Sequence, residues 1–153
     1  MSVVVAQIDI AAPPQAVWEF AMDPDRTLDW VTIAREVGET SDGDFRPGYR
    51  MDQKLCLRGV NFWVHWELKE VDAPWFARWE GKGPARSKAV IEDRLGEHDG
   101  GTRFDYRNEF KAPLGPLGAA ASRVVTGGIP EREAAASLKR LKALLEASRD
   151  RPG

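Results

Sequence analysis

Residues 60–71 read VNFWVHWELKEV, and this stretch decides the fold. Its apolar and polar side chains alternate one by one and form two sets: Phe62, Val64, Trp66 and Leu68 against Trp63, His65, Glu67 and Lys69. Successive side chains of a β-strand point to opposite faces of the sheet. The pattern therefore predicts a strand with one buried face and one face in contact with solvent.

The same period of two extends on both sides of this strand, from about residue 33 to residue 111. Short clusters of Gly, Pro, Asp and Ser interrupt it, and such clusters are typical of turns. We therefore expect further strands near 33–39, 49–58, 76–82, 87–97 and 102–111. A β-branched stretch predicts an earlier strand at 3–10. Short turns between consecutive strands favour an antiparallel meander.

Helices are predicted at both ends of this series of strands. Pro13 and Pro14 mark the start of a first short helix, and Asp23 is expected to cap a second one that begins at Pro24. Pro130 opens a long C-terminal helix, whose apolar stripe is Ala134, Leu138, Leu141 and Leu145. Between the last strand and this helix, Gly and Pro are too frequent for one straight helix. There we expect a loop, a short helix near 117–126 and a break.

Length, charge and cysteine content narrow the class of protein. The chain has 153 residues, with 22 basic and 24 acidic side chains and a net charge of −2, so a nucleic acid is not an expected partner. The one cysteine, Cys56, excludes an internal disulfide and fits a reducing compartment. No apolar run reaches the ~18 residues of a membrane helix, and no signal peptide is recognisable. We expect a cytoplasmic domain at 1–148 with a disordered tail at 149–153, acting as a monomer or homodimer.

Several local segments, taken in order, carry a family resemblance. They are IDIAAPPQAVW at 8–18, DPD at 23–25 followed by Trp30, PGYR at 47–50, LKEVDAP at 68–74, GGTRF at 100–104 and LKRLK at 138–142. Together they resemble the polyketide cyclase/dehydrase-type branch of the START-like (SRPBCC, helix-grip) superfamily, over about residues 3–147. The resemblance implies an α+β fold, in which a seven-stranded curved antiparallel sheet wraps around a long C-terminal helix, with two short helices after the first strand. The break at 127–130 departs from the uninterrupted final helix that is usual in that family.

This scaffold also implies a binding cavity. A strongly curved sheet cannot touch one straight helix along its whole length, so large side chains or a ligand must fill the gap. Ligand pockets of ~300–1,000 Å³ are lined mainly by apolar and aromatic groups. The strand phases place one set of residues on the inner face, and we expect these to contact the ligand: Met51, Gln53, Leu55, Phe62, Val64, Trp66, Trp79, Ile91, Phe104, Tyr106 and Asn108.

Polar residues within this inner-face set could do chemistry. Gln53, Asp93 and Asn108 would face an apolar interior, where they must pair with each other, with water or with a ligand. A bulge that shifts the register would instead turn Asp93 and Asn108 to solvent. The candidates for catalysis are Asp93, Tyr106 and Arg78.

A metal or other cofactor is not expected. The two histidines lie at unpromising positions, since His65 shares its face with charged side chains and His98 lies in a turn. No His, Cys or acidic residues follow metal-ligand spacing.

Three functions remain open at this point. The first is binding of an apolar or aromatic small molecule, such as a polyketide, lipid or isoprenoid-like compound, without further chemistry. The second is a cyclase or dehydratase that acts on a polyketide-like substrate in the same cavity, where cavity shape supplies much of the catalysis. The third is a stress- or chaperone-linked interaction module, for which the outward-facing Trp63 is the one indication.

Overall fold

The computed structural model describes residues 2–111 and 128–150, with side chains through residue 147. The elements follow in this order: β1 (Ser2–Ile10), α1 (Pro14–Ala21), the 3₁₀-helix η1 (Pro24–Arg26), α2 (Thr27–Trp30), β2 (Ala34–Thr40), β3 (Arg50–Leu57), β4 (Val60–Asp72), β5 (Phe76–Lys82), the 3₁₀-helix η2 (Pro84–Arg86), β6 (Lys88–His98), β7 (Gly101–Lys111) and α4 (Ile129–Asp150). The strands predicted from the period of two are all present.

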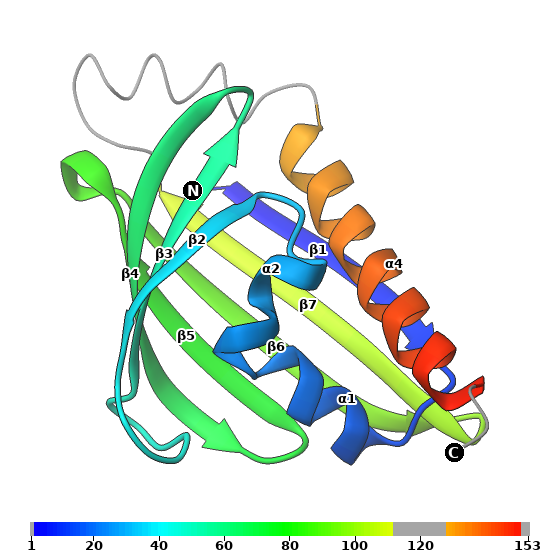
Figure 1. The fold of residues 1–153 in the computed structure, drawn as a ribbon. Coiled ribbons are helices and arrows are strands. Elements are labelled where there is room, and N and C mark those ends of the chain that lie inside the picture. Colours follow the sequence, from blue (N-terminus) through cyan, green and yellow to red (C-terminus); the bar gives the residue numbers. More distant parts are fainter. Residues whose placement is uncertain (1, 112–127, 151–153) are drawn as a thin grey trace.

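The strands form one sheet of seven, in the order β1-β7-β6-β5-β4-β3-β2, and every neighbouring pair is antiparallel. The sheet is strongly curved, and Figure 1 shows α1 and α2 in front of its concave side while α4 crosses beside β1. This arrangement confirms the predicted α+β helix-grip fold. None of the helices in the described ranges combines the length and the apolar character needed to cross a membrane.

The short helices begin where the sequence predicts. Helix α1 starts at Pro14, whose missing N–H would be unpaired in the first turn of any helix. The second start is capped by Asp23, because its side-chain oxygen accepts a 3.0 Å hydrogen bond from the backbone N–H of Asp25. The predicted short helix near 117–126 lies outside the described residues.

The apolar stripe of α4 packs against the core, as predicted. Leu138, Leu141 and Leu145 are all buried in one cluster with residues of the sheet and of α1. Burial of each leucine contributes about 1.5–3 kcal/mol to folding. The helix starts at Ile129, after Gly128 with its positive φ of 74°, and it continues through Asp150, past the predicted boundary at 148. Residues 151–153 of the predicted tail lie outside the described residues.

Polar contacts hold α4 at both of its ends. Near the C-terminus, Lys142 Nζ donates to the Asp9 carbonyl oxygen at 2.9 Å, and the backbone N–H of Ala11 donates to Glu146 Oε2 at 2.9 Å. Near the N-terminus, the backbone N–H of Thr32 donates to Ser137 Oγ at 3.0 Å. The helix is therefore attached to the end of β1 and also to the segment between α2 and β2.

The strand register decides which side chains face the helix. β6 and β7 pair without a shift from Lys88 opposite Lys111 to His98 opposite Gly101. Asp93 therefore lies directly across from Tyr106, and Ile91 across from Asn108. A bulge that would turn Asp93 and Asn108 to solvent does not occur in this ladder, so both residues keep the inner-face position that period two predicts.

Candidate functional site

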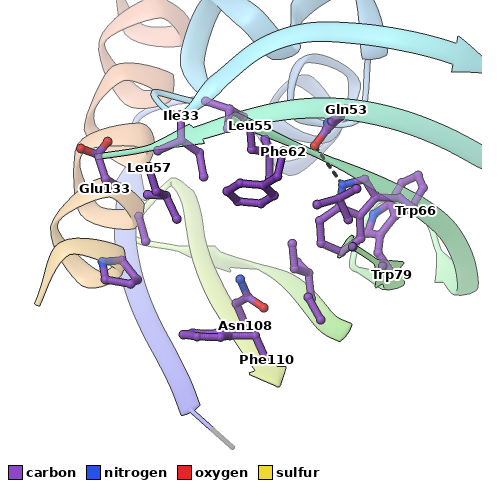
Figure 2. Close-up of a pocket in the computed structure, with 18 of the residues that line it drawn as sticks. Ile33, Gln53, Leu55, Leu57, Phe62, Trp66, Trp79, Asn108, Phe110 and Glu133 are labelled. Atoms are coloured by element: carbon purple, nitrogen blue, oxygen red, sulfur yellow. Dashed lines mark hydrogen bonds between the residues drawn. The ribbon is translucent and has the colours of Figure 1, made fainter. Parts of the chain in front are cut away.

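A cavity of about 820 Å³ lies between the concave face of the sheet and the helices α2 and α4. Strands β3 to β7 contribute most of its walls, and α2 and the first turns of α4 close the other side. Figure 2 shows side chains from these elements converging on the space. The walls are mainly aliphatic and aromatic, as expected of a site that holds an apolar small molecule.

Two tryptophans form one wall of the cavity. Trp66 of β4 and Trp79 of β5 are both buried. Trp66 Nε1 donates a 3.0 Å hydrogen bond to Gln53 Oε1 on β3, which appears as the dashed line in Figure 2. This bond pairs both polar groups within an apolar wall, so neither is left without a partner.

The Trp66 ring fits against a glycine on the neighbouring strand. A Cβ atom added at Gly81 would lie 2.6 Å from two ring atoms of Trp66 and 2.8 Å from Val64 Cγ1. Carbon atoms do not approach so closely, so only glycine leaves room for the ring here. Behind this wall, Trp79 makes edge-to-face contacts with Phe45 and Tyr49, at centroid distances of 5.8 and 6.2 Å.

Polar groups on β6 and β7 interrupt the apolar lining. Asp93 is only 8% exposed. Burial raises the pKa of this carboxyl to about 7. Burial also raises the pKa of Tyr106, and the neighbouring Asp93 charge adds to the rise while a hydrogen bond from the Asn108 side chain opposes it.

Asn108 carries an unpaired acceptor. Among the described residues, the buried side-chain atoms without a hydrogen-bond partner are Trp30 Nε1, Arg78 Nε and Asn108 Oδ1. Trp30 and Asn108 both line the cavity. Unpaired buried polar atoms are uncommon, because each costs about 1–3 kcal/mol relative to a paired one. A bound molecule can supply the missing partner at these two positions.

A further polar cluster on the helix side was not predicted from the sequence. The Thr32 hydroxyl donates to the Glu133 carboxylate and lies 3.2 Å from Ser137 Oγ. Glu133 and Ser137 line the cavity one helical turn apart on α4. Glu133 and Ser137 are four residues apart and lie on the same helix face as Leu138 and Leu141, so their spacing could have predicted that they face the interior. The partner from the α2–β2 connection could not be identified without the tertiary fold.

The structure places most of the predicted ligand-contact residues on the cavity. Met51, Gln53, Leu55, Phe62, Val64, Trp66, Trp79, Ile91, Tyr106 and Asn108 all line it. Phe104 does not: it is fully buried in the core, near the start of β7, where α1 contacts the strand. Residues of α2 and α4, such as Trp30 and Ala134, complete the lining and were missed because strand phase says nothing about helices.

One candidate for catalysis lies on the wrong face. Arg78 was expected in the interior, but its strand neighbours Ala77 and Trp79 point inward, so Arg78 points to the convex side. There its guanidinium forms a 3.5 Å ion pair with Glu70. His65 also lies outside, as predicted, and its Nδ1 is 2.7 Å from Asp52 Oδ1. No cluster of metal-ligating side chains occurs in the part of the chain that the structure describes.

Comparison with known proteins gives a family match and many similar folds. The family described as "Polyketide cyclase / dehydrase and lipid transport" matches residues 1–146. Protein Rv1546 of Mycobacterium tuberculosis is 24% identical over 131 residues, which span 84% of this chain and 92% of that protein.

Solved structures with the same fold cover nearly the whole chain. TTHA0849 from Thermus thermophilus has a TM-score of 0.79 at 17% identity, and the match spans 96% of this chain and 99% of that one. DynU16, from the dynemicin biosynthetic locus, has a TM-score of 0.68 at 15% identity, over 97% of this chain and 48% of its own. At these identities the similarity concerns the fold.

Proposed function

Because this chain belongs to the polyketide cyclase/dehydrase and lipid transport family, we propose that it binds an apolar or aromatic small molecule in the cavity between the curved sheet and α4. The observation that carries the proposal is the cavity itself, about 820 Å³ in volume and walled mainly by aliphatic and aromatic side chains. This volume falls within the range of known small-molecule sites. A polyketide, a lipid or an isoprenoid-like compound has the size and the apolar character to occupy it.

The energetics of such binding are favourable. A ligand that places about 300 Å² of apolar surface in the cavity gains about 7 kcal/mol from that burial. Loss of translational and rotational freedom offsets part of this gain. Rigid walls reduce the remaining cost, and the Trp66–Gln53 hydrogen bond and the contacts around Trp79 hold two of the wall side chains in place before a ligand arrives.

Two measurements test the proposal. Native mass spectrometry of freshly purified protein should show an added mass from a co-purified small molecule. In addition, a neutral environment-sensitive dye such as Nile red should bind the folded monomer with saturation and quench tryptophan fluorescence. Binding that appears only after mild denaturation would mean that side chains fill the interior, and it would contradict the proposal.

A second candidate function is catalysis of ring closure in the same cavity. It is favoured by Asp93, a buried carboxyl whose pKa of about 7 suits proton transfer near neutral pH. In this reading the Asp93 carboxylate takes a proton from a carbon between two carbonyl groups. The resulting enolate carbon bonds to another carbonyl carbon of the substrate, and the oxygen of that carbonyl collects the proton. The cavity would hold the flexible chain in a folded conformation.

The cyclase candidate is tested with a synthetic chain that carries alternating ketones. Wild-type protein should accelerate its cyclisation, and Asp93→Asn should abolish the acceleration while dye binding remains. Equal rates with both proteins would leave binding as the function and remove Asp93 as a base. The product is identified by liquid chromatography with mass detection.

A further inference from the structure

Two polar side chains stand out in the apolar wall formed by β6 and β7. Asn108 Oδ1 is buried without a hydrogen-bond partner among the described residues, and Asp93 is buried in the same wall. Both side chains line the cavity. Figure 2 shows Asn108 pointing from β7 into the cavity beside Phe110. The wall therefore offers polar partners to a molecule that occupies the cavity.

The register brings the side chains of Asn108 and Asp93 close together. Asn108 pairs with Ile91, and Tyr106 pairs with Asp93, so Asn108 and Asp93 are diagonal neighbours on one face of the β6–β7 ladder. Diagonal neighbours in an antiparallel pair are about 7–8 Å apart. Oxygen atoms that share a hydrogen bond are about 2.7–2.8 Å apart. One ligand oxygen can therefore lie between the two side chains and within reach of both.

The surroundings of this pair are aromatic. Tyr106 and Phe110 flank Asn108 along β7, and Trp66 and Trp79 stand on the strands beyond β6. A flat ring gains contact area against such walls at little conformational cost. A hydroxyl group on that ring can donate its proton to an acceptor that otherwise stays unpaired.

We propose that Asp93 and Asn108 form a docking point for a ligand hydroxyl group, so that the preferred ligand is a hydroxylated aromatic compound, a phenol, and not a plain hydrocarbon. This inference rests on the proposed function, because it names the class of molecule that the cavity selects. It assigns Asn108 Oδ1 as the acceptor of the ligand's hydroxyl proton, and the protonated Asp93 carboxyl as a donor to the oxygen of the same hydroxyl group. Tyr106, which lies directly across from Asp93, lines the cavity but does not make the main polar contact with the ligand.

The hydroxyl group is the part of the ligand that separates this proposal from simple apolar binding. A uniformly apolar cavity favours a methyl group over a hydroxyl group, because the hydroxyl loses its hydrogen bonds to water. A site with an unpaired buried acceptor reverses that order, because the analogue without a hydroxyl leaves the acceptor unpaired. Tighter binding of the hydroxyl compound than of the methyl compound therefore indicates the docking point.

The test uses two probes of nearly identical shape, 2-naphthol and 2-methylnaphthalene, which displace Nile red from the full-length protein. We expect 2-naphthol to bind wild-type protein about tenfold more tightly. Asn108→Leu, which keeps the volume and removes the acceptor, should reduce this ratio at least tenfold. Glu109→Gln, on the outer face of the same strand, should leave the ratio unchanged.

The outcomes distinguish this proposal from the one on which it rests. If 2-methylnaphthalene binds wild-type protein as tightly as 2-naphthol, the docking point is overturned while the binding function stands. If neither probe nor the dye binds, the proposed function fails. If Asn108→Leu does not fold, Asp93→Leu provides the second variant, and the wild-type comparison decides on its own. An unchanged ratio in a folded Asn108→Leu protein also overturns the proposal.

Discussion

The indole N–H of Trp66 donates to the side-chain oxygen of Gln53 across the β3–β4 pair. The two residues are diagonal neighbours, since Met51 stands opposite Trp66 and Val64 stands opposite Gln53. This bond fixes the orientation of a large aromatic ring that forms part of the cavity wall. Changes at Trp66 should therefore affect both the stability of the fold and the binding of a ligand.

Trp66→Ala should destabilise the protein more than Trp63→Ala. Trp66 is 6% exposed and its ring packs against Gly81, whereas Trp63 is 38% exposed on the other face of the same strand. Replacement of a buried Trp costs about 3–5 kcal/mol, and we expect the low end, because one side of the ring already faces open space. Trp63→Ala should stay within about 1 kcal/mol.

Urea unfolding with and without Nile red measures both effects. Trp66→Ala should also weaken the affinity for the dye, and Trp63→Ala should not. If Trp66→Ala leaves the affinity unchanged, the ligand site lies elsewhere in the fold.

Gly81→Ala should push the Trp66 ring out of place. The added methyl group would lie 2.6 Å from that ring, and the strand backbone leaves it no other direction. We expect a loss of about 1–3 kcal/mol in the free energy of unfolding and a clear loss of dye affinity. Gly96→Ala on β6 is the matched control, because nothing lies within 4 Å of its added methyl group. Equal effects of the two substitutions would argue against the packing of Trp66 on Gly81.

Stability should depend on pH through Asp93. The pKa of its carboxyl is 3.8 in an ordinary environment and about 7 in the folded protein. Between these values the folded state holds a proton that the unfolded state has lost, so stability falls as pH rises. The slope for one such group is about 1.4 kcal/mol per pH unit.

Asp93→Asn removes this titration and provides the comparison. The variant should match wild type near pH 4 and become increasingly more stable than wild type up to about pH 7, with no further change above it. Urea unfolding of both proteins at several pH values measures the difference, which cancels the titration of groups they share. A difference that does not change between pH 4 and pH 7 would mean that the Asp93 carboxyl is already ionised over this range in the folded state.

Leucine substitutions in α4 test which face of the helix packs against the core. Leu141 is 0% exposed, whereas Leu144, three residues later, is 37% exposed. Leu141→Ala should lower the free energy of unfolding by about 2–5 kcal/mol, and Leu144→Ala should change it by less than about 1 kcal/mol. Similar losses at the two positions would require a different rotation of α4 about its axis.

The strands could be predicted because the alternation of apolar and polar residues that marks a half-buried strand is a local feature of the sequence. Alternation along β4 fixes its two faces without any knowledge of the neighbours, and the same rule correctly oriented Asp93 and Asn108. The same rule, applied strictly, would also have placed Arg78 outside, since Ala77 and Trp79 flank it. The prediction of Arg78 as an interior candidate is therefore wrong.

Contacts between segments that lie far apart in the chain could not be predicted from the sequence. Phe104 follows the inner-face phase, yet the core formed with α1 and α4 closes over it, and only tertiary packing decides where the cavity ends. The cluster of Thr32, Glu133 and Ser137 joins residues about a hundred positions apart in the chain. No periodic pattern and no motif in the sequence predicts such a contact.

The attachment of α4 at both ends affects how fast a ligand enters and leaves the cavity. A molecule that enters by separating α4 from the segment before β2 must first break the contacts of Thr32 with Ser137 and Glu133. The contacts of Lys142 and Glu146 hold the far end during that opening. Breaking the Thr32 contacts therefore adds the same barrier to entry and to exit along this route, so it slows both rates and leaves the equilibrium affinity unchanged.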